Sequence, residues 1–271
     1  MTYPMTRRSA LGVLAAAPLV AQKSELPLSF TNLDHVEFFA SDVVKSVAFY
    51  ASIFGNSVLK NNKTTRRYVK LGSSYIAVET AGQAGIRVDH FCAGMPRFNV
   101  AEVHTYLTAH SVEYKDFPSG KDLAVPDPDG TRLQLAADNG WSLLSVSTAS
   151  PEAIPGGEPI FRPTGIEHIL LNVSEPERSA EFFSKLLGPV IQRNNNRIWF
   201  QVGTSRLGLL KTPEGQRAGV NHYGISAEPF DYAEVTRKLA RAGAKVETPE
   251  IAGSPDFRDP DGYRIQVVGR R

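Results

Sequence analysis

The sequence is poor in cysteine, in net charge and in long apolar segments. Its single cysteine, Cys92, excludes an intrachain disulfide framework and any zinc or iron–sulfur site built from several cysteines. The 30 basic and 28 acidic side chains give a formal charge of only +2, so no basic face for nucleic acid is expected. The sequence also lacks the G-x-S-x-G, P-loop and C-x-x-C motifs, which leaves hydrolases with a nucleophile elbow, P-loop enzymes and thioredoxin-like proteins without support.

The first 21 residues have the layout of a signal peptide. Arg7 and Arg8 precede an apolar run from Ala10 to Ala21, which is too short to span a bilayer. The paired arginines favour twin-arginine export, although Ala10 departs from the usual motif, and general secretion is the alternative. We therefore expect residues 1–21 to be a removed signal peptide and the protein to be periplasmic or extracellular, with no stable membrane anchor.

An internal repeat organises the remaining chain. The composition, with 42% hydrophobic and 21% charged residues among 271, is that of a globular protein large enough for two domains. Three segments recur at an offset of 132 or 133 residues: 32–36 at 165–169, 88–91 at 220–223, and 126–135 at 258–267. The segment between the copies is rich in Ser, Pro and Gly, with a proline at every fourth position from Pro151 to Pro163. We predict domains at 30–138 and 165–271, joined by an extended linker at 139–164.

The order of predicted elements also repeats within each domain. Ser174 and Glu177 form a capping-box pattern that predicts a helix over 175–187, and Ser41 opens the matching helix of the first domain. Second helices are expected to start at Asn99 and at Asp231. Strands fill the intervals, so the sequence predicts an α+β fold made of four βαβββ units.

Four βαβββ units, each with a histidine in its opening strand, and a closing D-P-D-G-x-R-[IL]-x strand in each domain resemble the vicinal oxygen chelate superfamily. This superfamily includes glyoxalases, fosfomycin and bleomycin resistance proteins and extradiol dioxygenases. The resemblance covers 30–138 and 165–271 and implies two tandem domains whose sheets curl into cups. It also implies a divalent metal, Fe, Mn, Zn or Ni, held by opening-strand and closing-strand side chains. The positions that match are His35, His90 and Gln134 in the first domain, and His168, His222 and Gln266 in the second.

The spacing of these positions agrees between the domains. The separations are 55 and 44 residues in the first domain, against 54 and 44 in the second. The alternative for the four repeated histidines is a core histidine bonded to a backbone carbonyl. The other two, His104 and His110, have Thr236 and Ala242 at the matching positions, so we predict surface helix residues there.

The closing-strand glutamine distinguishes this chain from the metal-dependent relatives, which usually carry glutamate at that position. A neutral amide can ligate through its oxygen but adds no negative charge. Three interpretations stay open for Gln134 and Gln266: a weak metal ligand, a substrate-binding amide in a metal-free pocket, or a strand residue that faces elsewhere. Trp199 could line the pocket or belong to the core, and Arg132 and Arg264 could contact an anionic substrate or form structural ion pairs.

Two familiar activities of the superfamily fit this sequence poorly. Extradiol members carry a tyrosine just before D-P and an additional acid–base histidine, both missing here, and glyoxalase activity on glutathione adducts does not suit an exported protein. No catalytic residue is assigned. We expect an exported protein that binds a small oxygen-rich molecule at a metal and acts as a lyase, isomerase or dioxygenase. The alternative is a metal-free protein that binds or sequesters a small molecule, as bleomycin resistance proteins do.

Overall fold

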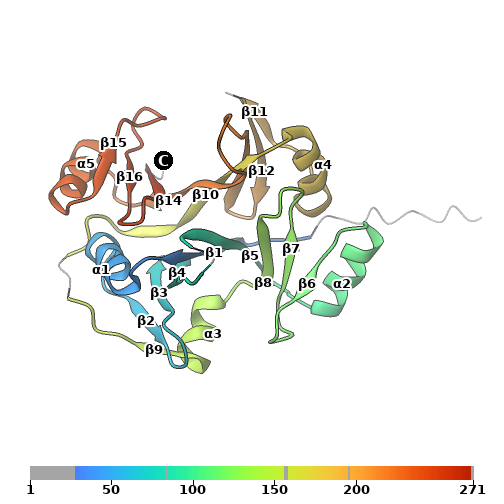
Figure 1. Ribbon diagram of the computed structural model, residues 1–271, viewed down its shortest axis with the longest axis horizontal. Coiled ribbons are helices and arrows are strands. Elements are labelled where there is room, and N and C mark those ends of the chain that lie inside the picture. The colour runs from blue at the N-terminus through green and yellow to red at the C-terminus, as the bar shows by residue number, and fades with distance from the viewer. Residues whose placement is uncertain (1–27, 84, 156–157, 195, 270–271) are drawn as a thin grey trace, which may run out of the picture.

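The computed structural model describes residues 28–83, 85–155, 158–194 and 196–269, and the predicted signal peptide lies outside them. Figure 1 shows two halves of similar construction, the N-terminal half in blue to green and the C-terminal half in yellow to red. Each half contains two consecutive βαβββ units. The predicted fold class, α+β with four βαβββ units in two tandem domains, is confirmed.

The elements follow the same order in both halves. The N-terminal half contains β1 (Asn32–Ala40), α1 (Val43–Phe54), β2 (Val58–Asn61), β3 (Arg67–Leu71), β4 (Ser74–Thr80), β5 (Arg87–Met95), α2 (Val100–Ala109), β6 (Lys115–Asp116), β7 (Leu123–Pro126) and β8 (Arg132–Ala137). The C-terminal half contains β10 (Pro163–Val173), α4 (Pro176–Leu187), β11 (Gln192–Asn194), β12 (Arg197–Val202), β13 (Ser205–Lys211), β14 (Gly219–Ala227), α5 (Tyr232–Arg241), β15 (Lys245–Glu247), β16 (Asp256–Arg258) and β17 (Arg264–Gly269). Between them lie α3 (Gly140–Ser147) and β9 (Ala149–Pro151).

The described strands form one 17-stranded sheet, which continues from one half to the other where Leu33 of β1 pairs with Ile166 of β10. The centre of each half of this sheet is formed by the opening strands of its two units. In the first half β1 runs parallel to β4 and antiparallel to β5, and β5 runs parallel to β8. The second half repeats this arrangement with β10, β13, β14 and β17. The registers also match, since Glu37 lies opposite His90 and Leu170 lies opposite His222. Equivalent residues of the repeat therefore occupy equivalent places in the two halves of the sheet.

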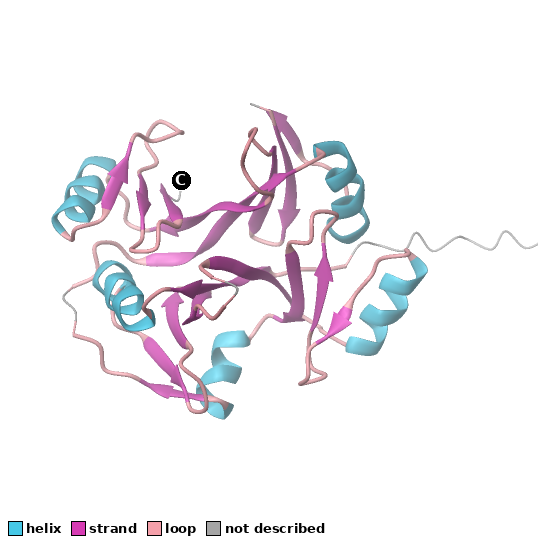
Figure 2. Cartoon of the chain, viewed as in Figure 1, coloured by secondary structure: helices cyan, strands magenta, loops and turns pink. Residues whose placement is uncertain are grey.

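Side chains of the central strands alternate between an apolar face and a polar face. Val36 and Phe38 of β1 are fully buried in the main core, and the ring of Phe38 packs against Tyr50 of α1 with centroids 5.7 Å apart. His35 and Glu37 alternate with them and face the other way. Figure 2 shows the helices at the periphery of the sheet. Helices α1, α2, α4 and α5 contribute buried residues to this core, so they cover the apolar face and leave the polar face for the site.

The second aspartate of each D-P-D-G turn connects the two halves. Asp261 accepts a hydrogen bond from the backbone N–H of Ser41 at 3.2 Å, and Asp129 accepts one from the backbone N–H of Ser174 at 2.8 Å. Each carboxylate also accepts from the hydroxyl of the same serine. The turn of one half is thereby fixed at the start of the first helix of the other half.

This contact overturns the predicted capping box between Ser174 and Glu177. Within the described part of the chain α4 has no side-chain cap; its N-cap position is Glu175, and Glu177 forms an ion pair with Arg193 at 2.8 Å. In α1 the N-cap is Asp42, one residue after the predicted serine. The sequence pattern failed because both serines bond to an aspartate from the distant half of the chain.

The second helices begin at their predicted N-caps. Asn99 accepts hydrogen bonds from the backbone N–H groups of the first turn of α2, and Asp231 does so in α5. Over the residues that the structure describes, none of the helices is both long and apolar enough to cross a membrane.

The segment 139–164 is only partly the extended linker that its prolines predict. It contains α3 and β9, and β9 pairs antiparallel with β2. Trp141 and Leu144 of α3 pack against a small buried cluster that includes Tyr68 and Tyr75 on the polar face of the first half of the sheet. Burial of these two apolar side chains stabilises a short helix that the Ser-rich and Pro-rich composition concealed.

Candidate metal centre

The four repeated histidines form two close pairs. His35 on β1 and His90 on β5 have their Nε2 atoms 3.2 Å apart, and His168 on β10 and His222 on β14 have theirs 3.0 Å apart. All four side chains are buried. Each histidine therefore pairs within its own half of the chain.

Each pair lies in a cavity, which we call the first cup and the second cup. The volume is about 280 Å³ for the first cup and about 540 Å³ for the second. Leu144 of α3 lines the first cup, while the second cup is bordered by the segment Ile251–Ser254 between β15 and β16. Each cup contains the three predicted residues of its half: His35, His90 and Gln134 in the first, and His168, His222 and Gln266 in the second.

A neighbouring carboxylate fixes the orientation of each glutamine amide. The Nε2 group of Gln134 donates to Asp122 at 2.5 Å, and that of Gln266 donates to Asp256 at 3.1 Å. Because a carboxylate only accepts hydrogen bonds, the amide nitrogen must face it and the amide oxygen must point away. The buried Oε1 of Gln134 has no hydrogen-bond partner among the described residues. A buried acceptor of this kind is available to a ligand or a cation.

Hydrogen bonds at Nδ1 determine which histidine nitrogens of the second cup carry protons. Nδ1 of His168 bonds to the Glu167 carboxylate, and Nδ1 of His222 bonds to the side-chain oxygen of Asn221 at 2.7 Å. The Asn221 amide donates from its nitrogen to Asn172 at 3.0 Å, which leaves its oxygen facing the imidazole. Both Nδ1 atoms are therefore donors, and in the neutral rings both Nε2 atoms present lone pairs.

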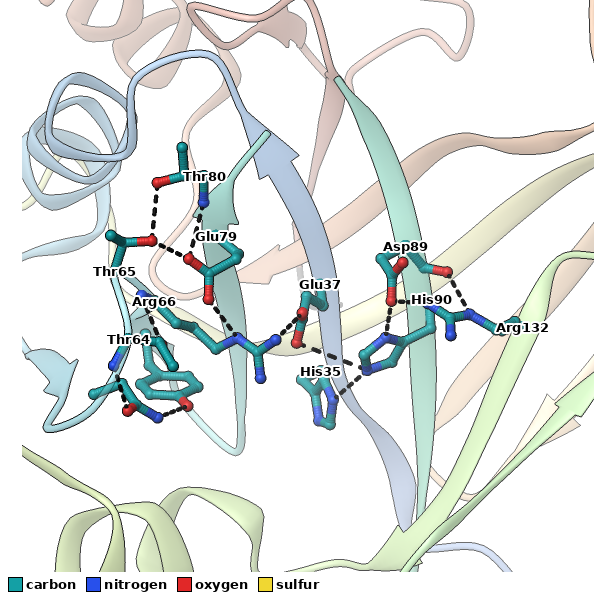
Figure 3. A network of polar contacts seen from close by, with 12 residues as sticks. His35, Glu37, Thr64, Thr65, Arg66, Glu79, Thr80, Asp89, His90 and Arg132 are labelled. Carbon is teal, nitrogen blue, oxygen red and sulfur yellow. Dashed lines mark hydrogen bonds and ion pairs between the residues drawn. The ribbon is translucent and has the colours of Figure 1, made fainter. Parts of the chain in front are cut away.

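The first cup differs by having a carboxylate on the Nε2 side of its histidine pair. Glu37 lies on the same face of β1 as His35, and its carboxylate is 4.0 Å from Nε2 of His90 and 2.6 Å from the guanidinium of Arg66 (Figure 3). Ligand atoms of Glu37, Asp89 and His90 all lie within 4.8 Å of one another. The repeat could not reveal Glu37, because Leu170 occupies the equivalent position of the second half. Its position two residues after His35 in a strand was the available signal.

Asp89 holds one imidazole of the first cup in place. Its carboxylate is 2.9 Å from Nδ1 of His90 and also contacts Arg132 (Figure 3). Burial by itself raises the pKa of Asp89, but the hydrogen bonds from His90 and Arg132 outweigh it and lower the pKa to about 2. Within the described chain, Nδ1 of His35 has no hydrogen-bond partner. The imidazoles of the first cup are therefore less completely fixed than those of the second.

Aromatic and basic residues complete the second cup. Trp199 lines the cup, its ring meets His168 edge-on at 5.6 Å, and the guanidinium of Arg206 lies 4.8 Å from its centroid. Tyr223 follows His222 and points to the opposite face of the sheet, where its hydroxyl donates to Tyr50 at 3.1 Å. Strand alternation accounts for the position of Tyr223, and of the two alternatives for Trp199 the cavity lining favours the pocket.

The remaining residues considered from the sequence lie outside the histidine pairs. His104 contacts Asp116 at 2.7 Å, and neither it nor His110 lines either cup. Arg264 makes an ion pair with Asp256 at 2.7 Å, as Arg132 does with Asp89. Both arginines therefore form ion pairs with aspartates that bond to a predicted ligand of their own cup, His90 or Gln266.

Comparison with known proteins agrees with this geometry. Residues 165–267 match the sequence model of the Glyoxalase/Bleomycin resistance protein/Dioxygenase superfamily. This half of the chain belongs to that superfamily. The resemblance to the vicinal oxygen chelate superfamily is thereby confirmed, and the solved structures that follow share the fold across both halves.

Three solved structures illustrate the shared fold. The 2,3-dioxygenase LapB from Pseudomonas sp. KL28 superposes with a TM-score of 0.71 at 15% identity, covering 90% of this chain and 94% of that one. The Mn(II)-bound glyoxalase from Novosphingobium aromaticivorans gives 0.66 at 16%, covering 89% and 82%. Homoprotocatechuate 2,3-dioxygenase from Arthrobacter globiformis gives 0.63 at 13%, covering 90% and 81%. Identities this low establish the architecture and leave the reaction to be argued from the residues of the cups.

Proposed function

We propose that this chain is an exported, metal-dependent enzyme that binds a small oxygen-rich molecule at a divalent metal in its cups. The reaction class is that of a lyase, an isomerase or a dioxygenase. The observation that carries the proposal is the pair of facing Nε2 atoms in each half, 3.2 Å and 3.0 Å apart.

The protonation pattern of the second cup favours a metal ion over a shared proton. Two lone pairs that face each other at 3.0 Å repel unless a cation lies between them. A proton is disfavoured, because burial lowers the pKa of His222 well below its usual range and the nearby His168, Arg264 and Arg197 lower it further. The same atoms are well spaced for a metal, since bonds of about 2.1 Å to both would subtend an angle of about 90–100°.

The residues that would hold the metal in the second cup are His168, His222 and the amide oxygen of Gln266. Nitrogen and amide oxygen ligands suit Fe(II), Mn(II), Zn(II) or Ni(II), and three protein ligands leave positions open for two substrate oxygens. When bound, the metal would supply Lewis acidity to those oxygens. In the first cup the corresponding set is His35, His90 and Gln134.

The protein supplies negative charge from behind the ligands. Glu167 holds His168, and Asp256 holds the amide of Gln266. Burial raises the pKa of Glu167, but its bonds to His168 and Arg206 outweigh this and lower it, so the carboxylate is charged at neutral pH. Such second-layer carboxylates orient the ligands and increase their basicity. They support a weaker site than a directly ligating glutamate would give.

Elemental analysis of untagged protein tests this proposal. We expect near-stoichiometric Mn, Fe, Zn or Ni in the purified protein and its loss after chelation. Protein with native folding, no bound metal and no affinity for added Mn(II) would contradict it and would support the alternative of a metal-free binding protein.

The export component has a separate test. Mature protein recovered from its host should begin near Gln22, and lysine at positions 7 and 8 should abolish twin-arginine export while leaving general secretion intact. Soluble protein that retains Met1 or Thr2 would contradict the signal peptide.

A further inference from the structure

The two cups carry an arginine at the same position of the repeat but neutralise it differently. Arg66 precedes Tyr68 by two residues in the first half, as Arg197 precedes Trp199 in the second. Tyr68 and Trp199 occupy equivalent registers, opposite Ala77 of β4 and Gly208 of β13. The pair therefore allows a direct comparison of one cationic position in two environments.

In the first cup the arginine is neutralised from within the sheet. Arg66 lies 2.6 Å from Glu37, whose side chain is only 5% exposed, and 3.5 Å from Glu79 (Figure 3). Glu37 belongs to the central strand β1, so it cannot leave the cup without disturbing the sheet. The Arg66 guanidinium is therefore paired with a carboxylate that the sheet holds in place, while its Nε, like those of Arg197 and Arg264, has no hydrogen-bond partner among the described residues.

In the second cup the partner is a carboxylate from a loop. Because Leu170 replaces Glu37, Arg197 pairs instead with Glu250, which lies between β15 and β16 and is 40% exposed. Arg197 itself is 7% exposed and lines the cup. Glu250 also contacts Arg264 at 2.9 Å. A single loop carboxylate thus bridges two arginines at the edge of the cavity.

The arginines retain unused hydrogen-bonding capacity. Within the described chain, the buried Nε atoms of Arg197 and Arg264 have no hydrogen-bond partner. If Glu250 moved away, these two cations would share only the buried carboxylate of Asp256, 2.7 Å from Arg264. A planar guanidinium with free N–H groups binds a carboxylate in a two-pronged geometry.

We propose that the second cup takes an organic carboxylate, which replaces Glu250 on Arg197 while the segment 248–255 moves aside. Glu250 then acts as an internal stand-in for the anionic group of the ligand. The inference rests on the proposed function only in assigning the ligand to the same cup. The carboxylate would bind Arg197, whereas the metal would bind the histidines and Gln266. It also assigns different roles to the two cups, since Arg66 is paired with Glu37, a carboxylate of the central strand β1.

Fluorescence titration with benzoate tests the proposal. The chain has two tryptophans, so Trp141→Phe leaves Trp199 as the only one and makes it a reporter inside the second cup. In this background Glu250→Gln should tighten benzoate binding about fivefold, because benzoate no longer competes with a charged loop carboxylate for Arg197. Arg197→Lys should weaken benzoate binding about tenfold, because a lysine ammonium cannot donate two parallel N–H bonds to one carboxylate as a guanidinium does. Neutral benzamide should bind at least tenfold more weakly than benzoate.

Matched controls separate a specific site from a general charge effect. Glu247→Gln makes the same charge change at an ion pair with Arg258 outside the cup and should leave benzoate affinity unchanged. Arg66→Lys in the first cup should also leave it unchanged. Circular dichroism and melting curves of each variant establish that the fold is intact. Equal benzoate affinity of the parent and Glu250→Gln, equal affinity for benzamide, or no benzoate binding by Glu250→Gln would each overturn the proposal.

The titration is repeated after EDTA treatment and with added Mn(II). Arg197-dependent benzoate binding by protein that takes up no Mn(II) would uphold the carboxylate site while contradicting the metal. Stoichiometric Mn(II) binding together with a benzoate affinity that Arg197→Lys leaves unchanged would uphold the metal and contradict the carboxylate site.

Discussion

The most informative change to the second cup exchanges two side-chain groups, so that position 266 carries a carboxylate and position 256, which bonds to it, carries an amide. Gln266→Glu alone would place two carboxylates about as close as the present 3.1 Å bond between Gln266 and Asp256. At an effective dielectric of about 20 their repulsion is about 5 kcal/mol before relaxation, so the metal-free variant keeps one proton on the pair. Adding Asp256→Asn removes this conflict. The asparagine amide can donate to the new carboxylate, and its oxygen can still accept from Arg264 and from the Glu250 backbone.

The double variant moves one negative charge from behind the ligand to the ligand position. The Coulomb gain toward a dication is several kcal/mol before desolvation is subtracted, and even a net gain of ~1.4 kcal/mol corresponds to about tenfold in affinity. We therefore expect Gln266→Glu/Asp256→Asn to bind Mn(II) at least about tenfold more tightly than the parent. The single Gln266→Glu variant must release its proton on binding, so its affinity should gain about another tenfold per pH unit.

Calorimetric titration with Mn(II) between pH 6 and 8 measures both effects. Gln201→Glu, at an exposed position of β12 outside the cup, is the control for added charge and should behave as the parent does. Tighter binding by Gln201→Glu to the same degree, or no tightening in the double variant, would refute the assignment of Gln266 as a ligand.

Three further predictions concern stability. Asp89→Asn should cost about 2 kcal/mol of unfolding free energy at pH 7, because the pKa of Asp89 is lowered to about 2 in the folded state. This stabilisation is present above pH ~4 and is lost as the pH falls toward 2. In urea unfolding, the free energies of the parent and the variant should therefore become equal near pH 2. Asp129→Ala and Asp261→Ala should each cost about 1 kcal/mol and add when combined, since each removes a separate contact between the halves; marked non-additivity in the same assay would mean that the two contacts are coupled. Trp141→Ala should cost about 1–2 kcal/mol of unfolding free energy by exposing the small apolar cluster of the first cup. An unchanged free energy of unfolding would show that α3 does not pack against this cluster in solution.

The repeat made the fold and the histidine pairs predictable. Residues that recur at one offset occupy the same register in the two halves of the sheet, so His35 and His168 had to reach equivalent positions, and His90 and His222 likewise. Strand alternation likewise accounts for Tyr223, which lies on the face away from the cup. These features depend on local periodicity and on the repeat, both of which a single sequence displays.

The features that break the repeat were the ones missed. Glu37 has an apolar counterpart, Leu170, so the repeat concealed the carboxylate that lies 4.0 Å from Nε2 of His90. Asp256 contacts Gln266 across two neighbouring strands, and the sequence alone does not give that register. Ser174 matched a capping pattern, but its partner Asp129 comes from the other half of the chain. Long-range partners of this kind decide the chemistry of the cups and leave little local signal.

Anomalous diffraction from crystals of Mn(II)-loaded protein tests the central claim most directly. The proposed site predicts a manganese peak in the second cup, about 2.1 Å from Nε2 of His168 and of His222 and bonded to the amide oxygen of Gln266. A manganese peak only at other residues, with the two imidazoles of the second cup still in direct contact, would contradict it.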